Sequence, residues 1–466
     1  MTGRFAALSY CWGDSQELAR NPPFIATAST CASLRTGIPL SGLPLTVRQA
    51  VEVCVCLGIE YLWVDALCII QDDTADWERE AKKMATVYTM ATVTIIAASS
   101  TSCHSGFFHV DLGSVRLDSP LPPQHQLVAR RVNRSGFHRF PKETGTHSGD
   151  PIDDRGWTYQ EEFLATRYIK FTDNDIQWRC REGTACLCHQ EAYTETEAVT
   201  LRLRPRAVNR WYRVVQNFNQ RNFTVATDKL PAFSGVVKTL APEMAAGAGK
   251  SSIYIAGLWR HLMLPGEDLL WYRYPGAPAH CYQDYVAPSF SWASVGTRIV
   301  FSNVDIKMGS WLSELVNADR ELTPNSDEFG RILQAFLTLR GPLISCTIRT
   351  LPNQNPELEL SPGQKLTLQS YRLDCAVSQV TLQTGKAAVQ RSTSSGSSFS
   401  DTDAHILLLQ TQESSLLNCH MLRGLLLGQL ATSSEFQRLG LVRLQGSAED
   451  VTKLKLEQQK HLVTLV

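Results

Sequence analysis

The sequence lacks an excess of charge of either sign, because 45 lysine and arginine residues are matched by 45 aspartate and glutamate residues. A neutral chain has no overall field to hold nucleic acid or an anionic membrane, so neither partner is expected. Long apolar runs are also lacking: the stretch 50–59 is interrupted by Glu52 and is too short to span a bilayer. With 43% hydrophobic and 19% charged residues, the chain is expected to fold as a soluble protein with a large core.

Residues 1–14 lack a basic segment followed by an apolar one, so no secretory signal is expected there. The 13 cysteines are an odd number and lack the dense, even spacing of a disulfide scaffold. Both features indicate a reducing compartment, and we expect a cytoplasmic protein. A P-loop, a GxGxxG after a strand, a GxSxG elbow and an HExxH motif are all missing, which disfavours several common enzyme classes.

The first hundred residues alternate between strand and helix patterns. Apolar runs at 5–10, 61–65 and 92–98 predict buried strands. Apolar residues recur at helical spacing over 44–58 and 77–91, which predicts two amphipathic helices. Strands separated by helices of this length favour right-handed crossovers and a parallel sheet, so the predicted fold class is α/β.

The rest of the chain divides by composition and pattern. Residues 107–152 show no sustained period and are interpreted as an irregular insertion in a core that covers 1–200. Residues 201–325 have a mainly helical pattern, and residues 326–466 contain short alternating runs that predict a β-rich region. The Ser-rich segment 391–403 is expected to be a disordered loop inside that region.

Polar clusters follow each of the three predicted strands. Ligands bind beyond the carboxyl ends of the strands in open parallel sheets, because loops and helix N-termini converge there. We therefore expect the clusters to form one ligand site, the alternative being that Asp65 and Ser99 cap helices or turns while Trp12 packs. The clusters are Trp12, Gly13 and Asp14 after the first strand, Asp65, Cys68 and Gln71 after the second, and Ser99, Ser100 and Ser102 after the third. Of these, the candidate ligand-binding residues are Trp12, Gly13, Asp14, Asp65, Gln71 and Ser99, together with Trp157.

Glu161 lies in the segment RGWTYQEE, on a predicted helix with Trp157 one turn before it. A carboxylate beside an aromatic wall can have a raised pKa or can stabilise positive charge that develops on a sugar. Glu161 is therefore the candidate catalytic residue, and Trp157 is the candidate wall of its site. The alternative is an ordinary solvated glutamate on a helix surface.

Three cysteines cluster with a histidine in CREGTACLCH, at Cys180, Cys186, Cys188 and His189. The C-x-C spacing differs from a zinc knuckle and no second ligand pair follows, so we expect reduced buried thiols and no metal. Cys68 has no histidine near it in the sequence and is expected to be packed rather than nucleophilic.

Specific motifs resemble the three blocks of the fungal heterokaryon incompatibility (HET) domain: ALSYCWGD at 7–14, LWVDALCIIQDD at 62–73 with the helix around Met84 and Tyr88, and RGWTYQEEFLATR at 155–167. The segments DKLPAFSGV, AGLW, LLWY and APSFSWASV, between 228 and 295, resemble the region that commonly follows this domain.

The sequence departs from the usual HET pattern in two places. The chain begins almost at ALSYCWGD, and Ile70 replaces the usual asparagine, which would remove a hydrogen bond that orients the loop.

The resemblance implies a role in fungal non-self recognition, where HET-domain proteins trigger growth arrest and programmed cell death when incompatible hyphae fuse. The HET core has been compared with TIR domains, a flavodoxin-like fold whose enzymatic members cleave NAD and place a glutamate four residues after a tryptophan. Trp157 and Glu161 repeat that spacing. The core is thus implied to be an effector with an unidentified protein partner, acting either as an NAD glycohydrolase without a bound cofactor or as a non-catalytic module that self-associates.

Overall fold

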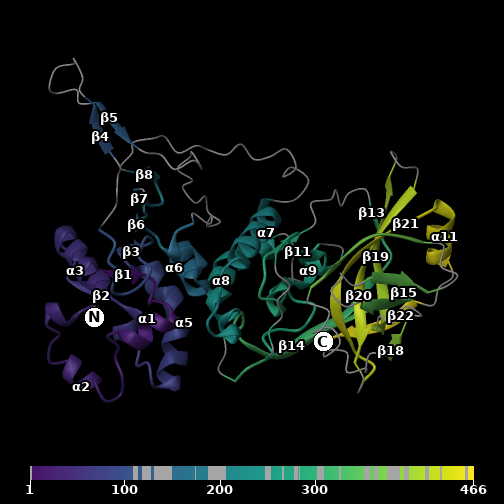
Figure 1. Ribbon diagram of the computed structural model, residues 1–466, viewed down its shortest axis with the longest axis horizontal. Helices are drawn as coiled ribbons and strands as arrows, with labels where there is room; N and C mark the ends of the chain where they lie inside the picture. The colour runs from purple at the N-terminus through teal and green to yellow at the C-terminus, as the bar shows by residue number, and fades with distance from the viewer. Residues whose placement is uncertain are drawn as a thin grey trace. The chain divides into compact units, whose positions relative to one another are not determined.

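The chain of the computed structural model forms two compact units (Figure 1). The first contains Met1–Thr196 with Arg221–Phe223, and the second contains Glu197–Gln220 with Thr224–Val466. The predicted domain boundaries at 200 and 325 lie outside the described residues. The structure describes residues 3–466 except 109–113, 118–126, 131–148, 174, 187–205, 247–252, 265–266, 278–281, 283, 302–308, 325–326, 351–356, 362–365, 375–388, 393–397, 415–418, 431–432 and 457–459.

A six-stranded sheet with the order β2-β1-β3-β6-β7-β8 lies at the centre of the first unit. β1 pairs in parallel with both β2 and β3, and β3 pairs in parallel with β6. β7 and β8 continue the sheet in antiparallel pairing. The predicted parallel sheet, and with it the α/β class of the N-terminal region, is confirmed. The strands are β1 (Phe5–Ser9), β2 (Tyr61–Trp63), β3 (Val93–Ala97), β6 (Tyr168–Phe171), β7 (Ile176–Arg179) and β8 (Thr184–Cys186).

Helices cover both faces of this sheet. Successive side chains of a strand point to opposite faces, so Ala6 and Leu8 of β1 pack with α3, whereas Ala7 packs with α5 and α6. Gly58, with a φ of +62°, ends α3 in the left-handed conformation that glycine adopts readily. The helical elements of the unit are α1 (Ser15–Arg20), α2 (Cys31–Leu34), η1 (Leu40–Gly42), α3 (Leu45–Leu57), α4 (Asp65–Cys68), α5 (Thr74–Met90), η2 (Pro151–Asp154) and α6 (Gly156–Leu164).

Two details of the predicted core differ in the structure. β3 is buried at every position, but β2 is an edge strand whose Tyr61 is 44% exposed, so the prediction that 61–65 is a buried strand is wrong. The amphipathic pattern over 77–91 predicts one buried face on α5; Met84 and Tyr88 of that face are buried, whereas Trp77 is only half-buried, against Trp157. Position at an edge depends on which strands pair, and a local apolar run carries no information about pairing.

The insertion 107–152 is not irregular throughout, because β4 (Ser114–Leu117) and β5 (Leu127–Arg130) form an antiparallel pair. Its last two residues begin η2, which leads directly into α6. Residues 109–113, 118–126 and 131–148 lie outside the described residues.

The second unit begins with α7 (Arg206–Phe218) and α8 (Pro231–Ala246) and continues into a large sheet. Its core is aromatic: Trp211 contacts Phe233 and Trp259, and Trp292 contacts Phe233. The segments DKLPAFSGV, AGLW and APSFSWASV contribute Phe233, Trp259 and Trp292, so their role is packing. The remaining elements before the sheet are β9 (Tyr254–Ile255), β10 (Leu258–Trp259), α9 (Arg260–Met263), β11 (Trp271–Arg273) and β12 (Ile299–Phe301).

A ten-stranded sheet confirms the predicted β-rich C-terminal region. The Ser-rich segment is partly structured: residues 398–403 belong to β19, where 400–403 pair with β15 and 398–399 pair with β18, so the predicted loop is wrong there. Residues 393–397 lie outside the described residues. The elements are β13 (Gly309–Trp311), β14 (Glu314–Leu322), β15 (Ile332–Thr350), β16 (Glu357–Leu360), β17 (Thr367–Leu373), β18 (Val389–Ser392), β19 (Ser398–Ser414), β20 (Cys419–Gln429), β21 (Phe436–Gly446), α11 (Ala448–Leu456) and β22 (Lys460–Leu465).

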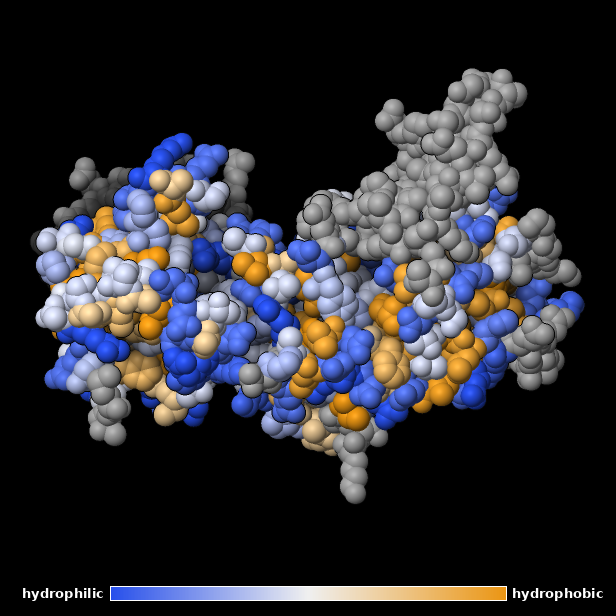
Figure 2. Space-filling view, turned by 90° about the horizontal axis from the view of Figure 1, so that it is seen from below, coloured by the Kyte–Doolittle hydropathy of each residue, from blue (hydrophilic) through white to orange (hydrophobic). Residues whose placement is uncertain are grey.

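Among the coloured residues on the face drawn in Figure 2, hydrophobic residues stand in small groups between hydrophilic ones. Among the described residues, no helix combines the length and the apolar character needed to cross a membrane.

Candidate functional site

The loops that leave β1, β2 and β3 meet at one edge of the first unit's sheet. The order β2-β1-β3 places a topological switch point between β1 and β3, where the connections run to opposite sides and leave a crevice in parallel sheets. The Trp12 indole Nε1 donates to Asp65 Oδ2 at 2.9 Å, and the Cys103 amide donates to the Trp12 carbonyl at 3.1 Å. The predicted convergence of the three loops is therefore present in the structure.

Asp65 stands at the start of α4, directly after β2. Its Oδ1 accepts a hydrogen bond from the Ala66 amide at 2.7 Å while Oδ2 accepts from Trp12. Burial raises the pKa of the Asp65 carboxyl above its ordinary value, and the hydrogen bond from Trp12, the Ala66 amide and the charge of Arg155 oppose that rise. Asp65 is thus both a helix-start residue and part of the strand-end cluster.

Glu161 is buried, with 5% of its surface exposed, on the face of α6 that packs against β1. Burial raises the pKa of Glu161 to about 7. The Ser9 hydroxyl, the charge of Arg155 and the Tyr88 hydroxyl lower this pKa, and the negative charge of Asp65 raises it. The alternative of a solvated surface glutamate is excluded by this burial. A carboxyl with a pKa near 7 is partly protonated and partly ionised at physiological pH, which is suited to acid–base catalysis.

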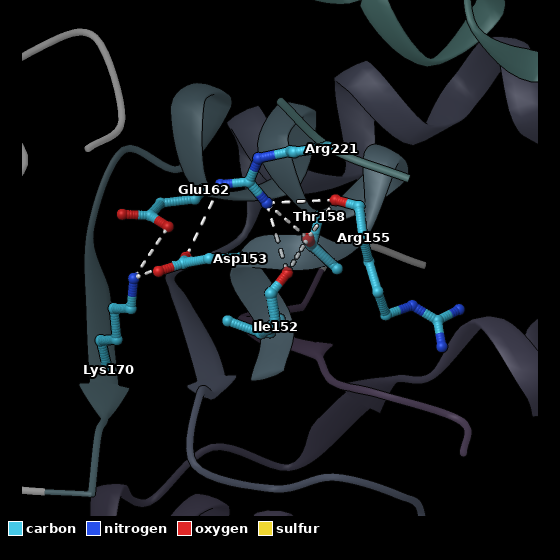
Figure 3. Close-up of polar contacts among 7 residues, drawn as sticks. All are labelled: Ile152, Asp153, Arg155, Thr158, Glu162, Lys170 and Arg221. Carbon is cyan, nitrogen blue, oxygen red and sulfur yellow. Dashed lines mark hydrogen bonds and ion pairs between the residues drawn. The ribbon is translucent and has the colours of Figure 1, made fainter. Parts of the chain in front are cut away.

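Arg155 is a member of this cluster that the sequence interpretation missed. It immediately precedes α6, and its charge lowers the pKa of Cys11, Asp65 and Glu161. In Figure 3 its backbone carbonyl takes part in a buried polar network, while its side chain extends away from that network. The only sequence signal was its place as the first residue of RGWTYQEE.

Other predicted site residues have structural contacts of their own. Trp157 packs edge-on against Trp77 of α5, with 6.1 Å between ring centroids. Asp14 is exposed and caps α1 by accepting from the Glu17 amide at 2.8 Å. Gln71 donates from Nε2 to the carbonyls of Asp65 and Ile69 at 3.1 and 3.0 Å.

Gly13 and Ser99 lie near the switch point. Gly13 has a φ of +123°, which residues with a Cβ rarely adopt, and a Cβ there would lie 3.2 Å from Ser102 Cβ. The Ser99 amide donates to the Phe171 carbonyl at 3.0 Å, and its buried hydroxyl has no hydrogen-bond partner among the described residues. Ser102 Oγ donates to Glu17 Oε1 at 2.5 Å, joining the loops after β1 and β3.

Backbone hydrogen bonds hold the loop in which Ile70 replaces the asparagine that is usual in the HET domain. The Ile70 amide donates to Asp76 Oδ2 at 2.8 Å, and the Gln71 amide donates to the Ala26 carbonyl at 2.8 Å. Backbone donors therefore hold the loop, and the expected loss of an orienting hydrogen bond does not leave it unsupported.

A buried ion network fixes α6 beside the site (Figure 3). Lys170 Nζ lies 3.2 Å from Glu162 Oε2 and 3.4 Å from Asp153 Oδ1, and Arg221 pairs with Asp153 at 3.6 Å. Burial lowers the pKa of Lys170, but the carboxylates of Glu162 and Asp153 raise it above its ordinary value, so its charge is retained. Two cations balance two anions, as burial of charge requires.

Arg221–Phe223 strengthens the start of α6 as well. Arg221 Nη1 donates to Thr158 Oγ1 at 2.8 Å, and the Gly156 amide donates to the Asn222 carbonyl at 2.9 Å. The Phe223 ring lies so close that a Cβ on Gly156 would be 2.0 Å from its Cε1. The helix that carries Glu161 is therefore positioned partly by residues sixty positions further along the chain.

The cysteine cluster does not have the predicted uniform state. Cys180 is a free, half-buried thiol, whereas Cys186 is disulfide-bonded, so the prediction of reduced thiols is wrong for Cys186. Cys188 and His189 lie outside the described residues. Cys68 is exposed rather than packed. Within the described parts of the chain, no three metal-binding side chains gather.

Comparison with known proteins identifies the first unit. The family model of the heterokaryon incompatibility protein (HET) matches residues 5–161, from the first residue of β1 to Glu161. No curated protein and no solved structure matches the chain. The matched range includes all three strand-end loops and α6 up to its buried carboxyl. Residues 5–161 are a heterokaryon incompatibility domain, and the chain is a HET domain-containing protein.

Proposed function

We propose that this protein acts in fungal non-self recognition, with its HET domain executing growth arrest and regulated cell death. The family match supports a function related to heterokaryon incompatibility. In this proposal the second unit has a regulatory or sensing role, and an unidentified protein of an incompatibility system is the partner that triggers the domain. We place the protein in the cytoplasm, where fusing hyphae mix their contents.

For the mechanism we propose an NAD glycohydrolase, with NAD as substrate rather than as a bound cofactor. The observation that carries it is the burial of the Glu161 carboxyl at the switch-point edge, coupled to Asp65 and Arg155. Water and NAD give ADP-ribose, nicotinamide and a proton, as the bond from the ribose anomeric carbon to the nicotinamide nitrogen breaks and a bond to water oxygen forms. Ionised Glu161 would stabilise the positive charge that develops on the ribose.

The surrounding residues have roles in this proposal that follow from their positions. Trp12 and Asp65, joined by a hydrogen bond, would contact the nucleotide beside β1, and Gly13 would let the backbone approach it closely. The Ser99 hydroxyl, in the loop after β3, would form a hydrogen bond with the nucleotide. Glu161 has only 5% of its surface exposed, so binding of the substrate in this proposal requires the side chains that cover Glu161 to move.

Turnover of NAD by the purified protein tests the mechanism. Glu161→Gln keeps the side-chain volume and removes the charge, so it should abolish release of nicotinamide while barely changing the melting temperature. The matched control is Glu78→Gln on the exposed side of α5, which should keep full activity. Equal nicotinamide release from the wild type and Glu161→Gln would refute the catalytic role, and no release from either would leave the incompatibility function without this chemistry.

A specific surface favours self-association as a second candidate. Val55 and Leu57 of α3 are 74% and 41% exposed, and Tyr61 of the edge strand β2 is 44% exposed. Apolar side chains next to an unpaired strand edge favour contact with another chain. Val55→Lys with Tyr61→Lys should then lower the mass measured by light scattering. Cell death that persists without NAD loss but disappears in this double variant would select self-association over catalysis.

A further inference from the structure

A small cavity of about 100 Å³ opens in the second unit, where β11 meets β17 and β21. Two of its six lining residues are arginines, and a tyrosine and a serine supply hydroxyl groups. The lining residues are Tyr272, Pro275, Ser370, Arg372, Leu441 and Arg443. This volume is far below the several hundred Å³ of ordinary ligand pockets, so the cavity suits one compact group.

One of the arginines that line the cavity, Arg443, forms an unfavourable pair of like charges with Arg423. Arg443 of β21 lies directly opposite Arg423 of β20 in the antiparallel register, and like charges in this position destabilise a sheet. Arg423 is only 6% exposed; burial and then the charge of Arg443 lower the pKa of Arg423 to about 10. On the other side, Ser370 of β17 lies opposite Arg443. Three strands therefore bring guanidinium and hydroxyl groups to one place.

Carboxylates do not neutralise this cluster. Within the described parts of the chain, Arg372, Arg423 and Arg443 form no ion pair. Glu267 is near enough to raise the pKa of Arg423, but it is one negative charge against three positive ones. Asp374, which follows β17, is already paired with Arg438 at 2.8 Å.

The neutral contacts of the cluster do not balance its charge either. Arg423 donates to the side-chain carbonyl oxygens of Gln410 and Gln412 at 2.9 and 3.5 Å. The Arg443 guanidinium lies 5.9 Å from the centre of the Tyr272 ring. These contacts hold the two arginines in place, but they contribute no negative charge.

We infer that this cavity is a binding site for a phosphate-type oxyanion, held by Arg372 and Arg443 and completed by the hydroxyl groups of Ser370 and Tyr272. Planar guanidinium groups match the oxygens of a phosphate through paired hydrogen bonds, and such charge-assisted bonds are the strong ones. A bound dianion would also relieve the repulsion between Arg443 and Arg423. The site belongs to the second unit and is separate from the HET domain chemistry proposed for Glu161.

Calorimetric titration of the full-length chain with inorganic phosphate, at low ionic strength and neutral pH, tests the site. The wild type should bind one phosphate, and its melting temperature should rise with phosphate but not with an equal ionic strength of chloride. Arg372→Gln changes an exposed residue and should weaken binding at least about tenfold. The matched control is Arg340→Gln, an exposed arginine elsewhere in the same sheet, which should bind as the wild type does.

Arg443→Gln gives a second readout that does not depend on ligand. Without phosphate it should raise the melting temperature, because it removes the charge opposite Arg423, and phosphate should no longer stabilise the protein. Glycerol phosphate binding more tightly than inorganic phosphate would support a phosphorylated small molecule as the natural ligand, and the reverse order would support the free ion. Equal affinity of wild type and Arg372→Gln, or stabilisation by chloride to the same extent, would overturn the site.

Discussion

Lys229 in the second unit gives the sharpest test of how burial changes the free energy of unfolding. Its amine is buried, and within the described part of the chain it forms no ion pair with a carboxylate. It is 1% exposed, and its amine donates to the Val295 carbonyl and lies 5.7 Å from the centre of the Trp292 ring. Burial lowers the pKa of Lys229 from 10.5 to about 7. At about 1.4 kcal/mol for each pH unit, this lowering corresponds to about 5 kcal/mol between the folded and unfolded proteins.

Proton linkage gives the direction in which the folding stability changes with pH. Between pH 7 and 10.5 the unfolded chain holds a proton on Lys229 that the folded protein has lost, so folding stability rises with pH across this window. Lys229→Met removes that dependence. At pH 7 the variant avoids about 4 kcal/mol of cost but leaves the Val295 carbonyl without its donor, a loss of about 1–3 kcal/mol. We therefore expect a net gain of roughly 1–3 kcal/mol in the free energy of unfolding at pH 7.

The decisive measurement is the difference between variant and wild type as a function of pH. Denaturant unfolding followed by tryptophan fluorescence should show the advantage of Lys229→Met falling by about 4 kcal/mol from pH 7 to pH 10.5. Lys238→Met, on the exposed side of α8, is the matched control and should show no such trend. A constant difference across this range would refute the lowered pKa and the reasoning built on it.

Three further outcomes test the first unit. If Glu161 must be ionised, NAD cleavage should rise with pH with a midpoint near 7, as its raised pKa requires; a flat profile from pH 6 to 8 would contradict this role. Gly156→Ala should lower the free energy of unfolding by about 2 kcal/mol or more because of the clash with Phe223, and Phe223→Ala should recover part of the loss. Arg221→Met should cost about 3–5 kcal/mol in urea unfolding, since it removes one of the two cations that pair with the buried Asp153 carboxylate.

Much of the first unit's core could be predicted because its signals are local. β1 and β3 are short apolar runs, and α3 has apolar residues at helical spacing and a glycine at its end, so pattern and structure agree. The convergence of Trp12 and Asp65 followed from the same argument, since parallel strands bring their carboxyl ends together.

The failures have a common physical cause, which is pairing between distant segments. Tyr61 is exposed because none of the described strands pairs on the outer side of β2, and no property of the run 61–65 encodes that. Residues 400–403 look disordered by composition, but β15 pairs with them through residues fifty or more positions earlier in the chain. Long-range strand pairing overrides local propensity in both cases.

The burial of two adjacent glutamates on α6 shows how the candidate site depends on the rest of the chain. Glu161 and Glu162 have the composition of a solvated helix face, yet both are buried, at 5% and 6% exposed. Glu162 is compensated by Lys170 of β6, and Arg221 closes the network from beyond α7. Glu161 receives no such ion pair from this network, so its carboxyl keeps the raised pKa of about 7.

The residues that hold α6 in place lie outside the range of the family match. The family match ends at Glu161, but Lys170 and Arg221, which hold α6 in place, lie after residue 161. A chain cut at residue 161 would lose both cations and leave Asp153 buried without either, which is costly for a carboxylate. The smallest piece expected to retain the Glu161 geometry therefore includes β6 and Arg221–Phe223.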